Sequence, residues 1–460
     1  MMVVSEDNDE GYPARGLCES AHADTREVNL RLSRANSSAP DSSIRKHRTA
    51  EASVIITASG APLAGREVIV RQLQHRFLFG CVGFEFVPLA NGEISADAPI
   101  RGEAGVEAVD GGPAGDVARL WFDLFNFATL PFYWGRFEGV RGRPDTGRLL
   151  NTARWFAERG CVVKGHPLAW HTVTADWLME LSNDEIARAQ VERIRRDVAD
   201  FAGVIDMWDV INEVVIMPIF DKYDNGITRV CREIGRIPMV RMVFDAAREA
   251  DPRATLLLND FDMSAAYECL IEGVLEAGIK IDALGLQSHM HQGYWGEEKT
   301  LGVIDRFARY GLPIHFTETT LVSGHLMPPE IVDLNDYRIP EWPTTPEGEE
   351  RQADEVVRHY KTLLSHPAVE AMTYWGLVDG GWLGAPGGLV RADGTPKPSY
   401  DALRSLIKGE WWLAPTTMVT DGAGRVRFDG FLGDYELAVD GRTMRFSLDE
   451  PGTAEVAVTL

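Results

Sequence analysis

The feature that most constrains the fold of this chain is a repeated alternation of short apolar runs with amphipathic stretches. The apolar runs begin at Phe77, Phe125, Cys161, Ile205, Ala254, Ile281, Pro313 and Val369. Runs of this kind separated by helical patterns are typical of β-α units and a parallel sheet. One stretch opens with Ser182 and Glu185, the spacing of a helix capping box. Eight such units without a glycine-rich phosphate-binding motif predict an α/β fold, a closed (β/α)8 TIM barrel over residues 77–410.

Both ends of the chain have a different pattern. Residues 46–76 alternate polar and apolar side chains on either side of a GAPLAG turn, which predicts a β-hairpin. Residues 411–460 contain further short alternating segments separated by Gly, Asp and Pro. Neither part buries much apolar surface alone, so we expect them to pair into one small sandwich-like β-domain beside the barrel. Residues 1–45 lack periodicity, and we expect them to be disordered or loosely attached.

Net charge and composition limit which classes of molecule this chain can bind. A net charge of −23 repels phosphate-rich surfaces, which argues against nucleic acid and membrane partners and permits a neutral carbohydrate. The five cysteines are odd in number and widely spaced, so neither a disulfide framework nor a metal site is expected. The acidic start of the chain is not a secretory signal, and no apolar run reaches the roughly 18–20 residues of a membrane span. We therefore expect a cytoplasmic protein, unless the start codon is wrongly assigned.

The active site of such a barrel lies at the C-terminal ends of its strands. The side chains expected there are His166, Trp170, His171, Asn212, Glu213, Gln287, His289, Glu318, Trp375 and Asp379. Two glutamates among histidines and tryptophans suit glycoside hydrolysis, because one carboxylic acid protonates the leaving oxygen while a second carboxylate attacks or stabilises the oxocarbenium-like transition state. A single glutamate at a strand end would often be a structural ion-pair partner. Two of them, each in a polar and aromatic cluster, indicate catalysis.

Six segments resemble motifs of glycoside hydrolase family 10, the xylanase-like family of retaining β-glycosidases, over about residues 77–408. The segments are GHPLAWH (165–171), WDVINE (208–213), LLLNDFD (256–262), GLQSHMH (285–291), HFTET (315–319) and WGLVDGGW (375–382). The order of WDVINE and HFTET is the most specific part of the resemblance.

The resemblance implies roles for the residues within these motifs. Glu213 should be the general acid/base and Glu318 the nucleophile, with no metal and no cofactor. Asn212 should bind the sugar 2-hydroxyl, and His289 should orient Glu318. Besides Asn212 and His289, the residues that should bind the reacting sugar are His166, Trp170, Gln287, Trp375 and Trp382. The carboxyl groups of a retaining pair lie about 5–5.5 Å apart, so the charge of Glu318 should raise the pKa of Glu213.

The second strand departs from the family pattern. Family xylanases have Thr-Pro-Glu-Asn-x-Met-Lys-Trp there, whereas this chain has TLPFYWGRFE (129–138). Arg136 stands near the expected Lys and is a candidate substrate-binding residue, but aromatic side chains replace the Glu and Asn that read sugar hydroxyls. The change either alters substrate preference or only repacks the barrel mouth. Long loops over residues 87–115 and 322–348 could also close one end of the cleft, which would favour short oligosaccharides.

Several functions are compatible with these residues. The leading hypothesis is a retaining, xylanase-like hydrolase of β-1,4-xylan or xylo-oligosaccharides. The alternatives are an exo-acting or aglycone-tolerant β-glycosidase and, more remotely, a non-catalytic carbohydrate-binding barrel. A metal-dependent hydrolase would use His166, His171, His289 and His291, although the motifs account for these residues without metal. The sugar, the oligomeric state and the role of the β-domain stay open.

Overall fold

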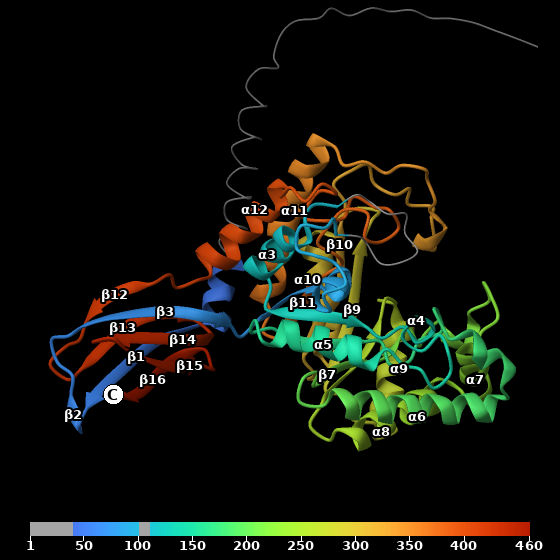
Figure 1. Cartoon of the computed structure of the whole chain (residues 1–460), viewed down its shortest axis with the longest axis horizontal. Coiled ribbons are helices and arrows are strands. Elements are labelled where there is room, and N and C mark those ends of the chain that lie inside the picture. The colour runs from blue at the N-terminus through green and yellow to red at the C-terminus, as the bar shows by residue number, and fades with distance from the viewer. Residues whose placement is uncertain (1–39, 101–110) are drawn as a thin grey trace, which may run out of the picture.

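The computed structural model describes residues 40–100 and 111–460. Eight parallel strands close into a barrel in chain order, with β11 pairing back to β4 (Figure 1). The strands are β4 (Leu78–Val82), β5 (Phe127–Pro131), β6 (Val162–His166), β7 (Met207–Asn212), β8 (Thr255–Asp260), β9 (Ala283–Met290), β10 (Ile314–Leu321) and β11 (Val369–Tyr374). Each strand begins within one of the eight apolar runs, and the predicted (β/α)8 fold is confirmed.

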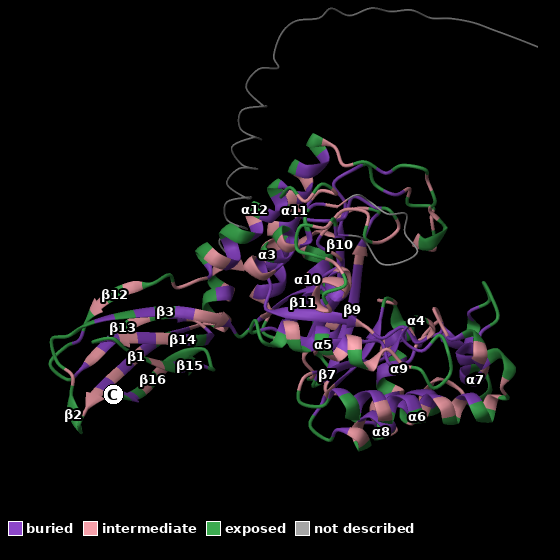
Figure 2. Ribbon diagram, in the orientation of Figure 1, coloured by how far each residue is buried: buried purple, intermediate pink, exposed green. Residues whose placement is uncertain are grey.

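Helices surround the barrel and bury their apolar faces against it (Figure 2). The longer ones are α3 (Ala114–Leu124), α5 (Thr146–Ala157), α6 (Asn183–Phe201), α7 (Gly226–Ile234), α8 (Arg236–Ala250), α9 (Ala265–Glu276), α10 (Gly296–Ala308), α11 (Pro346–Ser365) and α12 (Pro398–Ser405). The expected capping box is present at the start of α6, where Ser182 and Glu185 each accept a backbone N–H of the other. No helix within residues 40–100 or 111–460 has both the length and the apolar content that crossing a bilayer requires.

The inside of the barrel changes character along its axis. Near the start of the strands it is filled by an apolar cluster of Phe127, Met207, Leu257, Ala283 and Ala371. Further along, the buried side chains are polar, and they lead to the C-terminal ends of the strands. Because an apolar plug fills one end of the barrel, the polar side chains of an active site are expected at the other end.

The two ends of the chain form a β-sandwich beside the barrel (Figure 1). One sheet has the order β13-β1-β16 with β2 paired to β1, and the other has the order β12-β3-β14-β15. Its strands are β1 (Thr49–Ala58), β2 (Ala61–Pro62), β3 (Glu67–His75), β12 (Thr416–Val419), β13 (Arg425–Phe431), β14 (Gly433–Val439), β15 (Arg442–Leu448) and β16 (Gly452–Thr459). Apolar side chains from both sheets make one shared core, which matches the expected joint domain.

The predicted hairpin of residues 46–76 is wrong. Strands β1 and β3 do not pair with each other, because they lie in opposite sheets of the sandwich. The edges of β1 are occupied by β13 and β16, while β3 pairs with β12 and β14. This arrangement lets Val54 and Ile56 of β1 pack into the same core as Val68 and Val70 of β3, which a flat hairpin would not allow.

The expectation of a loose segment over residues 1–45 needs a partial correction. Residues 1–39 lie outside the described part of the chain, but residues 40–48 form a helix. Ile44 is buried in the barrel core, and Asp41 pairs with Lys361 of α11. Ile44 and Asp41 therefore both attach this helix to the barrel.

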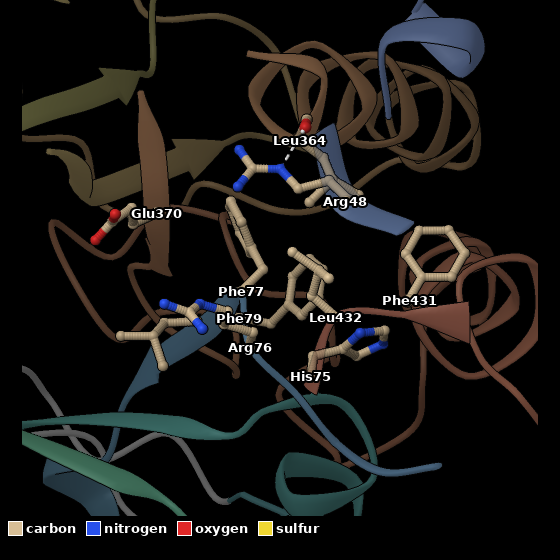
Figure 3. A pocket seen from close by; sticks show the side chains of 10 residues that line it. Arg48, His75, Arg76, Phe77, Phe79, Leu364, Glu370, Phe431 and Leu432 are labelled. Carbon is tan, nitrogen blue, oxygen red and sulfur yellow. Dashed lines mark hydrogen bonds between the residues drawn. The ribbon is translucent and has the colours of Figure 1, made fainter. Parts of the chain in front are cut away.

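Arg48 anchors the junction between the sandwich and the barrel. Its guanidinium donates to the carbonyl oxygens of Leu364 (2.9 Å), His366 (2.6 Å) and Val369 (2.6 Å), at the turn that leads into β11. The same group lies 5.2 Å from the ring centre of Phe77. Figure 3 shows Arg48 and Phe77 lining a pocket at this junction. The pocket adjoins the starts of β4 and β11, so the sandwich braces the end of the barrel away from the polar mouth.

We expect Arg48→Ala to lower the free energy of unfolding by about 2–4 kcal/mol, because three carbonyl groups lose a charged donor. The specific activity of the folded enzyme should not change, since Arg48 lies at the far end of the barrel from the predicted site. Denaturant unfolding followed by fluorescence measures the first effect. Arg45→Ala, an exposed arginine on the same helix, is the matched control. Equal stability of the two variants would contradict the anchoring role.

Candidate active site

The two predicted catalytic glutamates lie at the polar mouth of the barrel. Glu213 directly follows β7, and Glu318 is in the middle of β10, where it is 5 % exposed. The backbone of Glu213 is in the left-handed region with a φ of 57°, and its N–H donates to the carbonyl of Asn259 at 2.9 Å. A non-glycine residue in this conformation is unusual and needs support from its surroundings.

Three N–H donors surround the carboxyl group of Glu213. The indole nitrogen of Trp170 donates to Oε2 at 2.8 Å. The side-chain amides of Asn212 and Gln287 donate to Oε1, each at 3.2 Å. Three elements, the β6 loop and strands β7 and β9, thus fix the orientation of this carboxyl group.

The carboxyl group of Glu318 has a different set of neighbours. His289 Nε2 lies 3.1 Å from its Oε2, and the amide of Asn259 donates to its Oε1 at 3.0 Å. The same Asn259 amide donates to Asn212 Oδ1 at 2.7 Å, and its own oxygen accepts from the hydroxyl of Thr317. Asn259 and Asn212 therefore connect the two glutamates through a chain of hydrogen bonds.

The buried carboxylate of Asp209 fixes the orientation of the His166 ring. Asp209 Oδ2 accepts from His166 Nδ1 at 2.8 Å and pairs with Lys164 Nζ at 2.6 Å. Although burial opposes ionisation, the charge of Lys164 and the bond from His166 hold the pKa of Asp209 below its usual range. The ring of His166 is oriented so that its Nε2 lies 3.9 Å from Glu318 Oε1.

The surroundings of the two glutamates shift their pKa values in opposite directions. Burial and the nearby charge of Glu318 raise the pKa of Glu213 to about 8, despite the bonds from Trp170 and Gln287. Burial also acts against ionisation of Glu318, but the hydrogen bond from His289 and the proximity of His166 outweigh it and lower its pKa. One carboxyl group is therefore neutral near pH 7 while the other is ionised, the assignment that an acid and a nucleophile need.

The predicted aromatic residues contribute unequally to this mouth. Trp375 lies edge-on to His166 with ring centres 5.2 Å apart, and Trp382 packs on His289 at 4.2 Å. Trp170 is held through its bond to Glu213. Arg136, by contrast, is exposed in the short helix α4 (Trp134–Phe137) and lies beside the ring of Tyr133 at 5.8 Å.

The unusual second strand divides into two parts. Phe132 is buried against Phe201 and Trp208. Trp134 lies edge-on to Trp177 and contacts the guanidinium of Arg193 through its ring face. These two aromatic residues repack the structure beneath the mouth.

Tyr133 instead faces the site. Its ring lies edge-on to His166 at 5.7 Å and to Phe84 at 5.9 Å, and it is tilted against Trp170 at 5.5 Å. Phe84 follows β4 in the short helix η1 (Phe84–Phe86) and contacts Trp375. Together Phe84 and Tyr133 form an aromatic wall, the name used below, on the β4–β5 side of the mouth.

Two loops meet on another part of the rim. A small apolar core packs Leu383 and Ala385, from the loop after β11, against the β10 loop (residues 322–345). The β10 loop contributes Val322, Met327, Ile331, Leu334, Tyr337, Ile339 and Trp342. Lys222, in the loop between η3 (Met217–Ile219) and α7, pairs with Asp333 at 2.7 Å and Asp336 at 2.6 Å of this loop. The β10 loop and α7 both lie at the end of the molecule away from the sandwich (Figure 1). This ionic bridge joins the rims above β7 and β10.

Some residues of the site were not singled out from the sequence. Asn259 and Asp209 lie inside the quoted motifs LLLNDFD and WDVINE, yet they were given no role. The available signal for Asn259 was its position beside the C-terminal end of β8, whereas Asp209 lies inside β7 and had no such signal. Of the histidines considered as metal ligands, His171 lies beside the ring of Phe220. His291 lies beside the ring of Trp382, with its own ring centre 6.0 Å from that of His289. The described residues contain no group of three or more His, Cys, Asp or Glu arranged to hold a metal.

Comparisons with known proteins agree with this geometry. The model of glycosyl hydrolase family 10 matches residues 134–406, beginning at Trp134 within the altered second-strand segment. Endo-1,4-beta-xylanase B of Thermotoga neapolitana is 29% identical over 293 residues, covering 60% of this chain and 78% of the relative. Beta-1,4-xylanase of Dictyoglomus thermophilum is 29% identical over 266 residues, covering 53% and 69%.

Solved structures are similar in fold. The crystal structure of xylanase 10B from Thermotoga petrophila RKU-1 in complex with xylobiose matches with a TM-score of 0.57 and 21% identity. The match covers 73% of this chain and 95% of that one. The family model spans more than half of the chain and includes both strand-end glutamates. The chain belongs to glycosyl hydrolase family 10 and is a retaining, xylanase-like glycoside hydrolase.

Proposed function

We propose that this protein hydrolyses short β-1,4-linked xylo-oligosaccharides, with Glu213 as the general acid/base and Glu318 as the nucleophile. The observation that carries the assignment of roles is the opposite displacement of two pKa values within one hydrogen-bonded cluster. The names of the two relatives support the choice of sugar, since both are xylanases acting on a β-1,4 linkage.

In the first step, the ionised Glu318 attacks the anomeric carbon while the neutral Glu213 protonates the departing oxygen. The bond to the leaving group breaks, and a glycosyl ester forms on Glu318. This ester carries no charge, so one cause of the raised pKa of Glu213 disappears. The N–H donors from Trp170, Asn212 and Gln287 stay in place, and they stabilise the carboxylate that Glu213 has become.

In the second step, the carboxylate of Glu213 takes a proton from water, and the oxygen of that water attacks the anomeric carbon. The ester bond to Glu318 breaks, and both glutamates return to their starting states. His289 and Asn259 hold Glu318 through both steps, while Asp209 keeps His166 turned toward it. Each polar group of the cluster thus serves one of the two carboxyl groups.

The rim of the mouth supports a short substrate. The aromatic wall of Phe84 and Tyr133 lies above β4 and β5. The ion pairs of Lys222 join the loop after β7 to the loop after β10, and β8 and β9 lie between these two strands in the barrel. In an eight-stranded ring, β4 and β5 stand opposite β8 and β9. The mouth is therefore bounded on two opposite sides, which restricts the passage of a polymer more than that of a short chain.

A second candidate function is an exo-acting or aglycone-tolerant β-glycosidase. Tyr133 supports it, because an aromatic ring takes the place of side chains that would read the hydroxyls of a neighbouring sugar. A site that has lost these hydrogen bonds discriminates less strongly in favour of a second sugar at that position.

The nucleophile assignment is tested by substitution and rescue. Glu318→Ala should lower kcat by about 10⁴-fold or more, because no covalent intermediate can form. Glu213→Ala should lower kcat on a 2,4-dinitrophenyl glycoside by about 10²–10⁴-fold, because this leaving group departs without protonation but the glycosyl ester then has no general base for its hydrolysis. Sodium azide, which needs no base, should restore part of kcat with a β-glycosyl azide as product. Near-normal turnover by Glu318→Ala would refute the mechanism.

The pH profile follows from the two shifts. The value of kcat/KM should fall as pH rises through about 8, where Glu213 loses its proton, and again at acidic pH below the usual range of a glutamate, where Glu318 gains one. Carbon-13 NMR of labelled glutamate should show a lower pKa for Glu213 once Glu318 is trapped with a 2-deoxy-2-fluoro glycoside. An unchanged pKa in the trapped enzyme would show that the charge of Glu318 has no part in the shift.

The substrate is tested by product analysis on xylan, on xylobiose to xylohexaose and on a panel of aryl β-glycosides, with Glu318→Ala as the blank. We expect kcat/KM to be higher on xylo-oligosaccharides than on polymeric xylan. Activity confined to aryl glycosides would favour the second candidate. Tyr133→Ala should open the wall and raise activity on longer chains relative to aryl monoglycosides.

A further inference from the structure

A second buried carboxyl group lies behind Glu213. Asp260 is the last residue of β8 and is fully buried. Its Oδ2 accepts from the backbone N–H of Val215 at 3.0 Å, and its Oδ1 accepts from that of Asp262, also at 3.0 Å. No Lys or Arg of the described chain forms an ion pair with it. A buried charge held only by backbone amides is costly, so its presence calls for an explanation.

The bond to Val215 acts on a turn that carries strain. Glu213, two residues earlier, has the left-handed backbone described above. The turn is held on its β8 side by two bonds, from Glu213 N–H to Asn259 O and from Val215 N–H to Asp260 Oδ2. Strained conformations persist only where neighbouring structure fixes them, and here two consecutive residues of β8 do so.

We propose that Asp260 is a positioning residue that fixes the turn after β7 and thereby aims the carboxyl group of Glu213 at the leaving-group oxygen. The inference rests on the acid/base role proposed for Glu213. Asp260 does not touch the reacting atoms; it acts through the backbone of Val215. A small rotation of this turn would move the acid out of line with the departing oxygen, and such misplacement reduces catalysis strongly.

Charge is a second route by which Asp260 acts on Glu213. Burial raises the pKa of Asp260 to about 7, against the bonds from the backbone of Val215 and Asp262. Its charge is among the causes of the raised pKa of Glu213, after burial and Glu318. The other titratable groups facing this pair are Asp262 on the same loop, Tyr267 of α9 and Tyr223. Removing the charge of Asp260 should therefore move the alkaline limb of the pH profile to lower pH.

The decisive experiment compares two leaving groups on one sugar. In Asp260→Asn, an amide N–H₂ replaces one acceptor oxygen and opposes a backbone N–H, so the turn should shift. We expect kcat/KM to fall about 10–100-fold on a phenyl glycoside, which needs protonation, and by no more than about 3-fold on the 2,4-dinitrophenyl glycoside, which does not. Asp251→Asn is the matched control, because Asp251 is also buried and accepts a backbone N–H, but it precedes the start of β8.

Equal losses on both glycosides, or no loss on either, would overturn the proposal. Melting temperatures of both variants show whether the fold is kept. If Asp260→Asn does not fold, Asp260→Glu keeps the charge and displaces its oxygens by one methylene, and the same comparison of leaving groups applies. If Glu213→Ala itself shows no dependence on the leaving group, the role of Glu213 fails, which is a separate result from a failure of Asp260 alone.

Discussion

Two carboxyl groups that share one water-poor site repel each other when both are ionised, and the structure of the mouth resolves this repulsion unequally. Glu318 has His289, His166 and Asn259 as neighbours, which favour its charge. Glu213 accepts N–H bonds from Trp170, Asn212 and Gln287, but burial and the charge of Glu318 outweigh them and keep its pKa high. The pairing of β7 with β8 brings Asn212 opposite Asn259, and this register joins the two groups. The barrel, its apolar plug and the bracing sandwich keep that register fixed.

Much of the fold could be predicted because its signals are local. Each barrel strand is a run of apolar residues that is buried on both sides, and each helix is amphipathic, so eight units could be recognised along the chain. The partners of β1 and β3 could not be predicted in this way. A turn between two alternating segments looks the same whether the strands pair or face each other across a sandwich. The strands that resolve this ambiguity lie about 350 to 400 residues away, as in the register of Ser53 with Arg427 and Glu455 and of Val70 with Thr416.

Site residues could be predicted when a side chain suited to catalysis or sugar binding also lay at the end of a predicted strand. Glu213, Glu318 and the residues expected beside them are of this kind. Asn259 and Asp260 were missed because an Asn-Asp pair at a strand end is equally typical of a turn. Their roles depend on what they contact across the barrel, which no single strand reveals. The aromatic second strand was ambiguous for a related reason. Phe132, Tyr133 and Trp134 are adjacent in sequence, yet only Tyr133 turns toward His166.

The sandwich has a consequence for how the chain is made. Strand β1 is central in its sheet, and the two long strands that flank it, β13 and β16, come from the last 40 residues of the sequence. During synthesis at about 5–20 residues per second, β1 and β3 wait roughly 20–80 s for those partners while the barrel forms between them. For that time two apolar strands have unpaired edges, which are templates for association with other chains. Among the strands described here, those synthesised last are thus the ones that remove this hazard.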